Sequence, residues 1–201
     1  MQRKFDFLVI GSGLAGLSYA LKVADRAKGR VAVVSKNGLE ESNTRYAQGG
    51  IASVMYAPDD FEQHIRDTLE SGDGMGDREV IEMVVREAPS QINALLEWGV
   101  EFDRKSDGTY DLGREGGHTH YRVLHHKDNT GEEIQAKLVR LVRQHPNIEI
   151  LENHFAVDLI TQHHLGAEVA VFHRGPVHSG ELGVALGRGL RDLLSDRTAA
   201  G

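Results

Sequence analysis

The chain has 201 residues, 40% of them hydrophobic and 26% charged, which predicts a folded globular protein rather than a disordered one. Its formal net charge of -7 argues against nucleic acid or an anionic membrane as a partner. The lack of cysteine excludes disulfides, iron–sulfur clusters and thiolate catalysis. Because no apolar run approaches the roughly 20 residues that span a bilayer, we expect a cytoplasmic protein.

A strand, a helix and a second strand are predicted at the start of the chain. Residues 5–10 form an apolar run that ends at a glycine, as a buried parallel strand does. Residues 14–28 then carry apolar side chains at helical spacing, and residues 30–35 form a second apolar run. Together they match a βαβ unit, which needs about 30 residues and joins parallel strands.

Two helices and a hairpin are predicted next. Residues 36–58 form a polar, glycine-rich loop, and helical periodicity returns over 59–71 and 77–97. Pro89 lies inside the second of these helices and is expected to kink or divide it. Residues 100–125 predict a hairpin-like excursion.

A further helix and two strands complete the predicted elements. Thr130 and Glu133 match a capping box, which predicts a helix that starts there and runs to about Gln144. The segments "IEIL" at 148–151 and "FAVDLI" at 155–160 are typical of strands.

The composition changes after about residue 165. The remaining sequence is rich in glycine and arginine and has only a weak helical period. We therefore expect a folded region over residues 1–165 and a divergent, poorly packed tail over 166–201.

A glycine turn joins the first predicted strand to the first helix. Gly11, Gly13 and Gly16 satisfy G-x-G-x-x-G, in which the glycines permit a tight turn, close approach to a pyrophosphate and close packing of helix on strand. The first turn of the helix presents free N–H groups and a partial positive charge to the phosphates. Because a strand precedes the motif and a helix follows it, nucleotide binding is favoured over a purely structural turn.

The second predicted strand ends without the expected acid. NAD-binding domains place a carboxylate there for the adenosine ribose, whereas this chain has Ser35 and Lys36. The hydroxyl can still bond a ribose, but the ammonium group weakens the case for NAD. Two alternatives remain at this point, which are NADP with its 2′-phosphate and an FAD domain that has replaced its acid.

The next loop favours FAD. "SNTRYAQGGIA" at 42–52 combines polar side chains with the pair Gly49 and Gly50, which let backbone N–H groups approach a flat ring or an anion. With "GSGLAGL" and "VVSK", this segment resembles the flavoprotein superfamily of succinate dehydrogenase, fumarate reductase and L-aspartate oxidase. Members of the membrane-bound complexes carry a histidine where this chain has Asn43, so the resemblance implies non-covalent FAD.

The resemblance implies an α/β fold, a Rossmann-like FAD-binding domain whose central parallel sheet is flanked by helices. It also implies truncation before the capping and C-terminal helical domains, so no catalytic residue is placed in this chain. The strand at 155–160 is similar to the one that touches the adenine. The residues implied to bind FAD are Gly11, Ser12, Gly13, Leu14, Ala15, Gly16, Ser35, Lys36, Ser42, Asn43, Thr44, Arg45, Tyr46, Ala47, Gln48, Gly49, Gly50, Ala156 and Val157.

The segment "GREGGHTHYRVLHHKDNTGEEI" at 113–134 looks most like L-aspartate oxidase. Glu115 stands where dicarboxylate dehydrogenases have a non-acidic residue, and a carboxylate suits a substrate with an ammonium group. The resemblance implies that Glu115 and His118 bind the substrate. The histidines of this segment lack cysteine partners and a known ligand spacing, so no metal site is predicted.

The activity implied by the resemblance is FAD-dependent oxidation of L-aspartate to iminoaspartate by hydride transfer, in the biosynthesis of NAD. Oxygen or fumarate is the implied acceptor, and quinolinate synthase a functional partner. Three alternatives stay open, which are a soluble fumarate reductase or succinate dehydrogenase, a truncated nucleotide-binding module without catalysis, and an NADP-dependent reductase.

Overall fold

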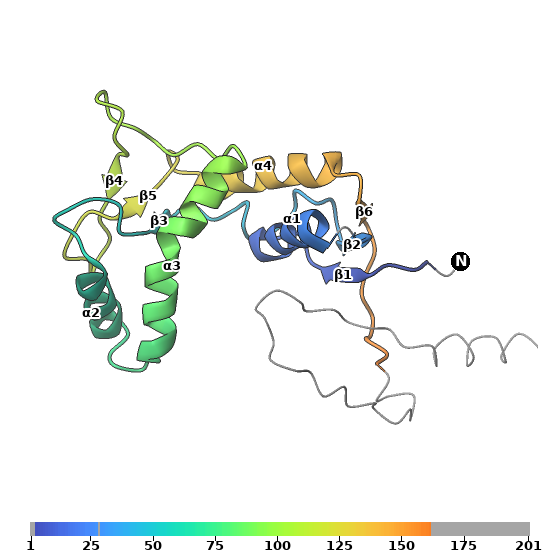
Figure 1. Ribbon diagram of the computed structural model, residues 1–201, viewed down its shortest axis with the longest axis horizontal. Coiled ribbons are helices and arrows are strands. Elements are labelled where there is room, and N and C mark those ends of the chain that lie inside the picture. Colours follow the sequence, from blue (N-terminus) through green and yellow to red (C-terminus); the bar gives the residue numbers. More distant parts are fainter. Residues whose placement is uncertain (1–2, 28, 162–201) are drawn as a thin grey trace, which may run out of the picture.

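A computed structural model describes residues 3–27 and 29–161 of the chain, so the predicted tail at 166–201 lies outside the described residues. The described elements form two lobes (Figure 1). We call the lobe that contains the parallel sheet the nucleotide lobe and the lobe that contains the antiparallel sheet the hairpin lobe. Helix α3 runs between them (Figure 1).

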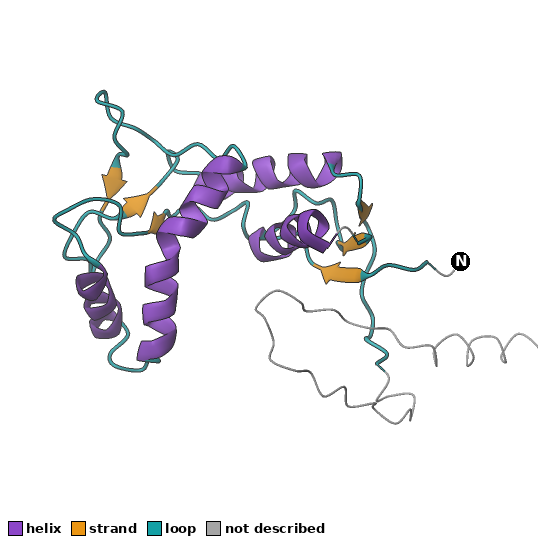
Figure 2. Ribbon diagram, viewed as in Figure 1, coloured by secondary structure: helices purple, strands orange, loops and turns teal. Residues whose placement is uncertain are grey.

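The nucleotide lobe contains a three-stranded parallel sheet and two helices (Figure 2). The sheet has the order β1-β2-β6, with Phe7 opposite Val31 and Val31 opposite Ile148. The predicted α/β fold with a parallel sheet is confirmed. Its elements are β1 (Phe7–Ile10), α1 (Leu14–Ala27), β2 (Val31–Val34), α4 (Thr130–Gln144) and β6 (Ile148–Leu151).

The core of this lobe lies between the sheet and its two helices. Alternate residues of a strand point to opposite faces, so Val9 is buried against the helices while Leu8 and Ile10 are 54% and 49% exposed. Helix α1 contributes the apolar stripe expected from its spacing, and α4 adds a second stripe. The buried residues of the two helices include Leu17, Ala20, Leu21, Ala24, Ile134, Leu138, Val139 and Val142.

The hairpin lobe contains a small antiparallel sheet and the pair of helices α2 and α3. The sheet has the order β3-β5-β4, with Ile51 opposite Leu124 and Leu112 opposite the same residue. The predicted hairpin is therefore confirmed. Its elements are β3 (Ile51–Ala52), α2 (Phe61–Ser71), α3 (Arg78–Glu97), β4 (Leu112–Gly113) and β5 (Val123–Leu124).

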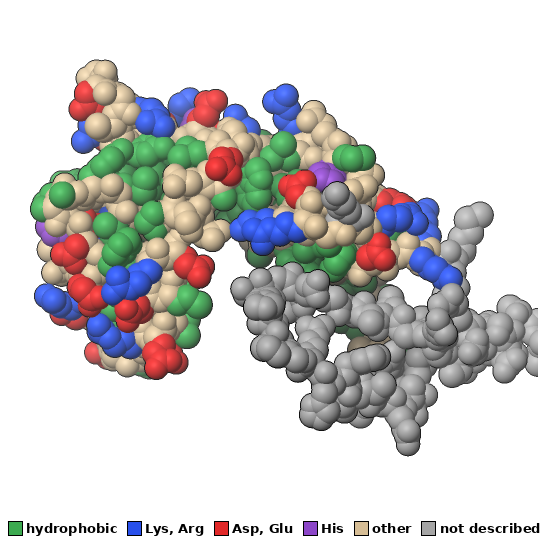
Figure 3. All heavy atoms as spheres, in the orientation of Figure 1, with side chains coloured by type: hydrophobic (Ala, Val, Ile, Leu, Met, Phe, Trp, Pro, Cys, Tyr) green, Lys and Arg blue, Asp and Glu red, His purple; other side chains and the backbone are tan. Residues whose placement is uncertain are grey.

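Charged side chains cap the two helices of the hairpin lobe and form ion pairs on their surface. Asp60 caps α2 by accepting a hydrogen bond from the Gln63 N–H at 2.8 Å, and Asp77 caps α3 in the same way. Ion pairs of Arg86 with Glu62 and Glu82 lie on the outer surface, where Figure 3 shows acidic and basic side chains gathered over α2 and α3. Part of the exposed surface of the two helices is thus charged, while Val80, Met83 and Val84 of α3 are exposed apolar side chains.

Helix α3 is not divided at Pro89. The helix continues through the proline from Arg78 to Glu97, and its axis changes direction partway along (Figure 1). Its last turns reach the nucleotide lobe, where Ile92 and Leu95 join the same apolar core as α1.

Two predictions of local structure are wrong. Residues 155–160 do not form a strand, and Phe155 and Val157 are 76% and 89% exposed, because no described strand pairs with them. Thr130 and Glu133 do not form a capping box. The Thr130 hydroxyl accepts a hydrogen bond from the His126 N–H in the loop before α4. The Glu133 carboxylate accepts one from the Glu101 N–H in the segment after α3.

Candidate nucleotide site and its neighbouring hairpin

The glycine turn lies at the carboxyl ends of β1 and β2. Gly11 has φ +107°, a conformation that L side chains rarely adopt, and its N–H donates to the Val34 carbonyl at 2.9 Å. A Cβ on Gly16 would stand 2.3 Å from the Gly11 carbonyl oxygen. Gly11 is thus needed for the turn itself, and Gly16 for the packing of α1 against that turn.

The end of β2 meets the glycine turn through two hydroxyl groups. The Ser12 and Ser35 oxygens are 3.2 Å apart and both residues are buried, whereas Lys36 is exposed. Ser35 therefore lies next to the turn. Its own contact is with Ser12, and Lys36 is the side chain that faces solvent.

Loop 42–50 packs directly on the start of α1. The Thr44 hydroxyl accepts a hydrogen bond from the Leu14 N–H at 3.0 Å, so one free N–H of the helix is bound by the loop. Within the loop, Asn43 is exposed, and so is the run from Arg45 to Gly49. The segment predicted to hold the pyrophosphate and the segment predicted to hold the flavin therefore adjoin each other.

Helix α4 holds this loop in place, and the sequence analysis did not predict this contact. The Gly131 N–H donates to the Ala47 carbonyl at 2.9 Å, and a Cβ on Gly131 would stand 1.9 Å from the Thr44 carbonyl oxygen. The buried Gln135 amide donates to the carbonyls of Ser12 and Leu39, both at 2.7 Å. The "TG" of "DNTGEE" is the only local signal, since a glycine in a helix's first turn is unfavourable unless something packs there.

The residues at the turn and loop fit a dinucleotide. The N–H groups of Ala15 and Gly16 belong to the first turn of α1, which has no carbonyl partner within the helix. A Cβ on Gly11 or Gly49 would meet nothing within 4 Å, so there is space beside both glycines. The buried Gln135 Oε1 has no protein partner among the described residues. The turn and the loop thus offer N–H donors and space, and Gln135, which binds the Ser12 carbonyl of the turn, keeps an unpaired acceptor.

The segment predicted to touch the adenine begins beside Ser35. The His154 N–H donates to the Ser35 carbonyl at 3.0 Å, which fixes the chain next to β2. Ala156 and Val157 follow two and three residues later in exposed, irregular chain. The segment therefore leaves the end of β2 beside Ser35, the residue predicted to hold the adenosine.

Glu115 and His118 lie in the other lobe, on the loop between β4 and β5. Glu115 is exposed, and its N–H lies 3.4 Å from His118 Nδ1. The His118 ring meets the His64 ring of α2 edge to face, with centroids 6.0 Å apart. No hydrogen bond or ion pair among the described residues joins this loop to the glycine turn, but loop 42–50 leads into β3, which pairs with β5.

Beneath the β4–β5 loop lies a buried charge network that the sequence did not indicate. Arg122 is fully buried and donates to both Asp59 carboxylate oxygens, at 2.7 and 3.0 Å. A third guanidinium nitrogen lies 2.8 Å from an Asp67 oxygen. Burial alone would raise the pKa of Asp67, but hydrogen bonds from Thr119 and Gln63 and the Arg122 charge hold it well below its usual range.

His64 lies next to this network and is neutral at pH 7. Burial, reinforced by the Arg122 charge, lowers the pKa of His64 to about 4, and its Nδ1 has no partner among the described residues. The arrangement keeps one more positive charge away from the guanidinium.

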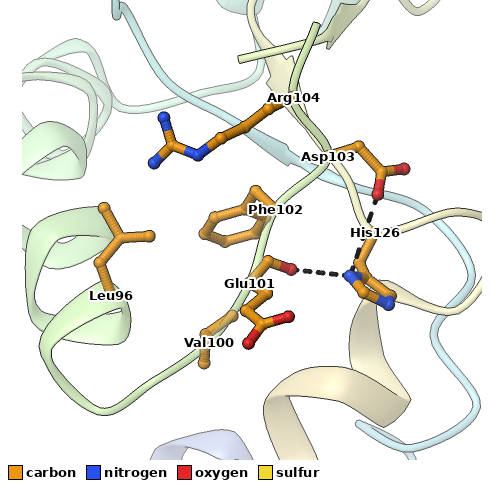
Figure 4. A pocket seen from close by; sticks show the side chains of 7 residues that line it. All are labelled: Leu96, Val100, Glu101, Phe102, Asp103, Arg104 and His126. Carbon is orange, nitrogen blue, oxygen red and sulfur yellow. Dashed lines mark hydrogen bonds and ion pairs between the residues drawn. The ribbon is translucent and has the colours of Figure 1, made fainter. Parts of the chain in front are cut away.

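A cavity of about 370 Å³ opens elsewhere, between the end of α3 and the chain after β5 (Figure 4). Its lining includes Leu96, Val100, Glu101, Phe102, Asp103 and His126. His126 Nδ1 lies 2.8 Å from the Glu101 carbonyl oxygen, and the Lys127 N–H chiefly holds the pKa of Asp103 below its usual range. No residue predicted to bind FAD or substrate lines this cavity. Across residues 3–27 and 29–161 no cluster of three or more His, Asp or Glu side chains could hold a metal ion.

The class of protein follows from these features together with a family match. Residues 6–182 match the model of the FAD binding domain family, and the chain belongs to this family. The prediction of an FAD-binding domain is confirmed.

The curated relatives identify a particular branch. The chain is 47% identical over 159 residues to L-aspartate oxidase 2-b, chloroplastic, of Nicotiana tabacum, and 44% identical over 172 residues to L-aspartate oxidase of Vibrio cholerae. These matches cover 79% and 83% of this chain but only 24% and 32% of the relatives. The chain therefore spans about a quarter to a third of their length, and the predicted resemblance to L-aspartate oxidase is confirmed.

Solved structures show the same fold. The FrdA chain of a variant E. coli quinol fumarate reductase has a TM-score of 0.75 at 32% identity, over 79% of this chain and 27% of that one. A Mycobacterium smegmatis Sdh1 complex gives 0.69 at 31% identity, over 74% and 27%. In the part of this chain that the structure describes, no helix is long and apolar enough to cross a membrane.

Proposed function

We propose that the chain is the FAD-binding part of an L-aspartate oxidase, which binds FAD non-covalently and contributes the loop that recognises the substrate's amino group. The bond between the Leu14 N–H and the Thr44 hydroxyl carries the first half of this proposal. It joins the glycine turn to loop 42–50, which gives an extended dinucleotide one continuous surface.

Each part of this surface has its own task. The free N–H groups of Ala15 and Gly16 bind the pyrophosphate, with the helix dipole behind them. Ser35, Lys36 and the chain at Ala156 and Val157 hold the adenosine end. The flavin end lies along Ser42–Gly50. The amide side chain of Asn43 is not a nucleophile, so it forms no covalent link to the flavin. Bound FAD supplies the ring that accepts a hydride.

Glu115 distinguishes this proposal from a fumarate or succinate enzyme. Its carboxylate is exposed on the β4–β5 loop and makes no ion pair among the described residues, so it is free to meet an ammonium group. Succinate and fumarate lack that group and would instead be repelled. Nearby, His118 presents a ring for hydrogen bonding to a carboxylate of the same substrate.

The wider assignment follows from the family. Oxidation of L-aspartate to iminoaspartate belongs to the biosynthesis of NAD, with oxygen or fumarate as the acceptor and quinolinate synthase as the consumer of the product. We propose a cytoplasmic location, although the plant relatives are named chloroplastic.

The visible spectrum of the purified 201-residue chain tests the proposal. We expect a yellow protein that releases all its FAD on acid denaturation, with an absorbance change when L-aspartate is added. A colourless chain that does not take up added FAD would contradict the proposal, and FAD retained in the acid pellet would contradict non-covalent binding.

The Glu115→Gln variant tests the substrate. It should bind L-aspartate about tenfold more weakly or worse, since a charge-assisted hydrogen bond contributes about 1.5–3 kcal/mol. Succinate should bind no more weakly than before. The Glu87→Gln variant, at an exposed acid on α3, serves as the control. If succinate perturbs the parent's spectrum and L-aspartate does not, the chain belongs to the fumarate reductase alternative.

A further inference from the structure

The β4–β5 loop lies along one face of helix α2. Gly117 packs on Ser71, since a Cβ at this glycine would stand 2.3 Å from the Ser71 hydroxyl, and its φ of +85° also favours glycine. His118 meets the His64 ring, and Thr119 meets Asp67. Residues 64, 67 and 71 are three and four positions apart, so they share a face of the helix. Three consecutive loop residues are thus in contact with that face.

Asp67 is the centre of this contact. One of its oxygens accepts the Thr119 N–H at 2.8 Å, and the other accepts the Thr119 hydroxyl at 2.7 Å and the Gln63 amide at 2.8 Å. Asp67 is buried, with only 3% of its surface exposed. Because both the backbone and the side chain of Thr119 bind one carboxylate, the position and the orientation of this residue are set together.

Arg122 connects this contact to the sheet. Its backbone belongs to the hairpin, with its N–H donating to the Gly113 carbonyl at 3.0 Å and its carbonyl accepting from the Ser53 N–H at 2.8 Å. Its guanidinium forms an ion pair with Asp67 on α2, without an aligned hydrogen bond from Nη1, and a hydrogen-bonded ion pair with Asp59 just before that helix. The loop is therefore held at both ends of the segment from Gly113 to Arg122, with Glu115 and His118 between.

We infer that Asp67 and Arg122 are positioning residues, which hold the β4–β5 loop on α2 so that Glu115 and His118 meet the substrate in one fixed arrangement. This rests on the proposed function, in which those two residues bind L-aspartate. Neither Asp67 nor Arg122 touches the substrate, because both are buried beneath the loop. Their effect on binding passes through Thr119.

Substrate binding by the FAD-loaded 201-residue chain tests the inference, with L-aspartate added and flavin absorbance followed. Asp67→Asn and Thr119→Val should each raise the Kd for L-aspartate about 10-fold to 100-fold, the cost of misplacing a binding group. Thr119→Ser keeps the hydroxyl and should bind like the parent. The Kd for FAD should stay within about twofold in every variant, since the nucleotide site lies in the other lobe. Glu70→Gln, at an exposed acid on the same helix, is the control.

Hydrogen exchange at the Thr119 amide gives a second readout that needs no substrate. We expect slow exchange in the parent and much faster exchange in Asp67→Asn, with the amides inside α2 unchanged. Unchanged L-aspartate binding in Asp67→Asn and Thr119→Val would overturn the inference. Equally faster amide exchange in α2 and in the loop would also overturn the inference, because the network would then only stabilise the fold. If L-aspartate does not change the flavin absorbance of the parent, the proposed function is wrong. Hydrogen exchange at the Thr119 amide then still tests whether Asp67 holds the loop.

Discussion

The two lobes hold their functional segments by opposite means. In the nucleotide lobe, the glycine turn and loop 42–50 are fixed over an apolar core by uncharged groups, chiefly the Thr44 hydroxyl and the Gln135 amide. Gly16 and Gly131 leave no room for a side chain. In the hairpin lobe, the loop with Glu115 is fixed by buried charges, above all Arg122 and Asp67.

This difference suits the two proposed ligands. A pyrophosphate is bound well by N–H groups at a helix start, and these are the same whatever the side chain. An amino acid differs from a dicarboxylate by one ammonium group, so its recognition depends on one carboxylate held in one place. The first task needs close packing, whereas the second needs a rigid support for a single charge.

Arg122→Met gives the largest effect we expect, and it falls on the hairpin lobe. Methionine fills much of the space but leaves Asp59 and Asp67 as unpaired buried carboxylates, which costs about 3–5 kcal/mol of unfolding free energy. Urea unfolding followed by circular dichroism measures the loss, and hydrogen exchange should place it in α2 rather than in α1. Arg114→Met, at an exposed arginine of the same loop, should change the stability little. Equal loss in both variants would contradict the role of the buried network.

Gly50→Ala tests the junction between the lobes. A Cβ there would stand 2.2 Å from the Leu124 carbonyl oxygen, so β3 must move away from β5, at a cost of about 3 kcal/mol. The neighbouring Gly49→Ala is the matched control for stability, because its Cβ would meet nothing within 4 Å. We expect Gly49→Ala to unfold like the parent yet to bind FAD more weakly, since the proposed flavin end lies there. If both alanines are tolerated equally in unfolding, the close approach of Gly50 is not needed.

The contrast between the lobes also explains what could be predicted from sequence. The pattern of Gly11, Gly13 and Gly16 predicted the turn because strand, turn and helix are adjacent in the chain, so their geometry leaves a local mark. The positions of α1, β2 and β6 followed from apolar runs in the same way. Gln135 was missed because it acts on Ser12, 123 residues earlier, and nothing near Gln135 marks it.

The hairpin lobe was harder to predict for the same reason. Arg122 and Asp67 are charged residues with no distinguishing neighbours, and only the folded chain brings them together under the loop. The apolar segment at 155–160 indicated a strand, but a strand needs a partner, and no described segment pairs with these residues. Local pattern predicts an element's tendency, whereas pairing and burial decide the outcome.

The pH dependence of stability offers a milder test of the hairpin lobe. Burial lowers the pKa of His64 to about 4 from 6.5, so the unfolded chain takes up a proton first as the pH falls. Stability should therefore be full above pH 6.5 and fall by about 2–3 kcal/mol between there and pH 4. Urea unfolding at several pH values measures this slope. His64→Gln should flatten it, whereas His154→Gln, at an exposed histidine, should leave it unchanged. A parent slope that survives in His64→Gln would contradict the assignment.

Gln135→Leu should give the smallest loss of stability and a clear effect on the nucleotide lobe alone. Leucine fits the apolar side of α4 but cannot donate to the Ser12 and Leu39 carbonyls, which are then left without this partner at a cost of about 1–2 kcal/mol. The Ser12 carbonyl belongs to the glycine turn, so FAD should bind more weakly, while exchange at the Thr119 amide stays slow. Gln144→Leu, at an exposed position of the same helix, controls for the added apolar surface. A Gln135→Leu variant that binds FAD like the parent would mean that the glycine turn keeps its shape through its own backbone bonds, such as that from the Gly11 N–H to Val34.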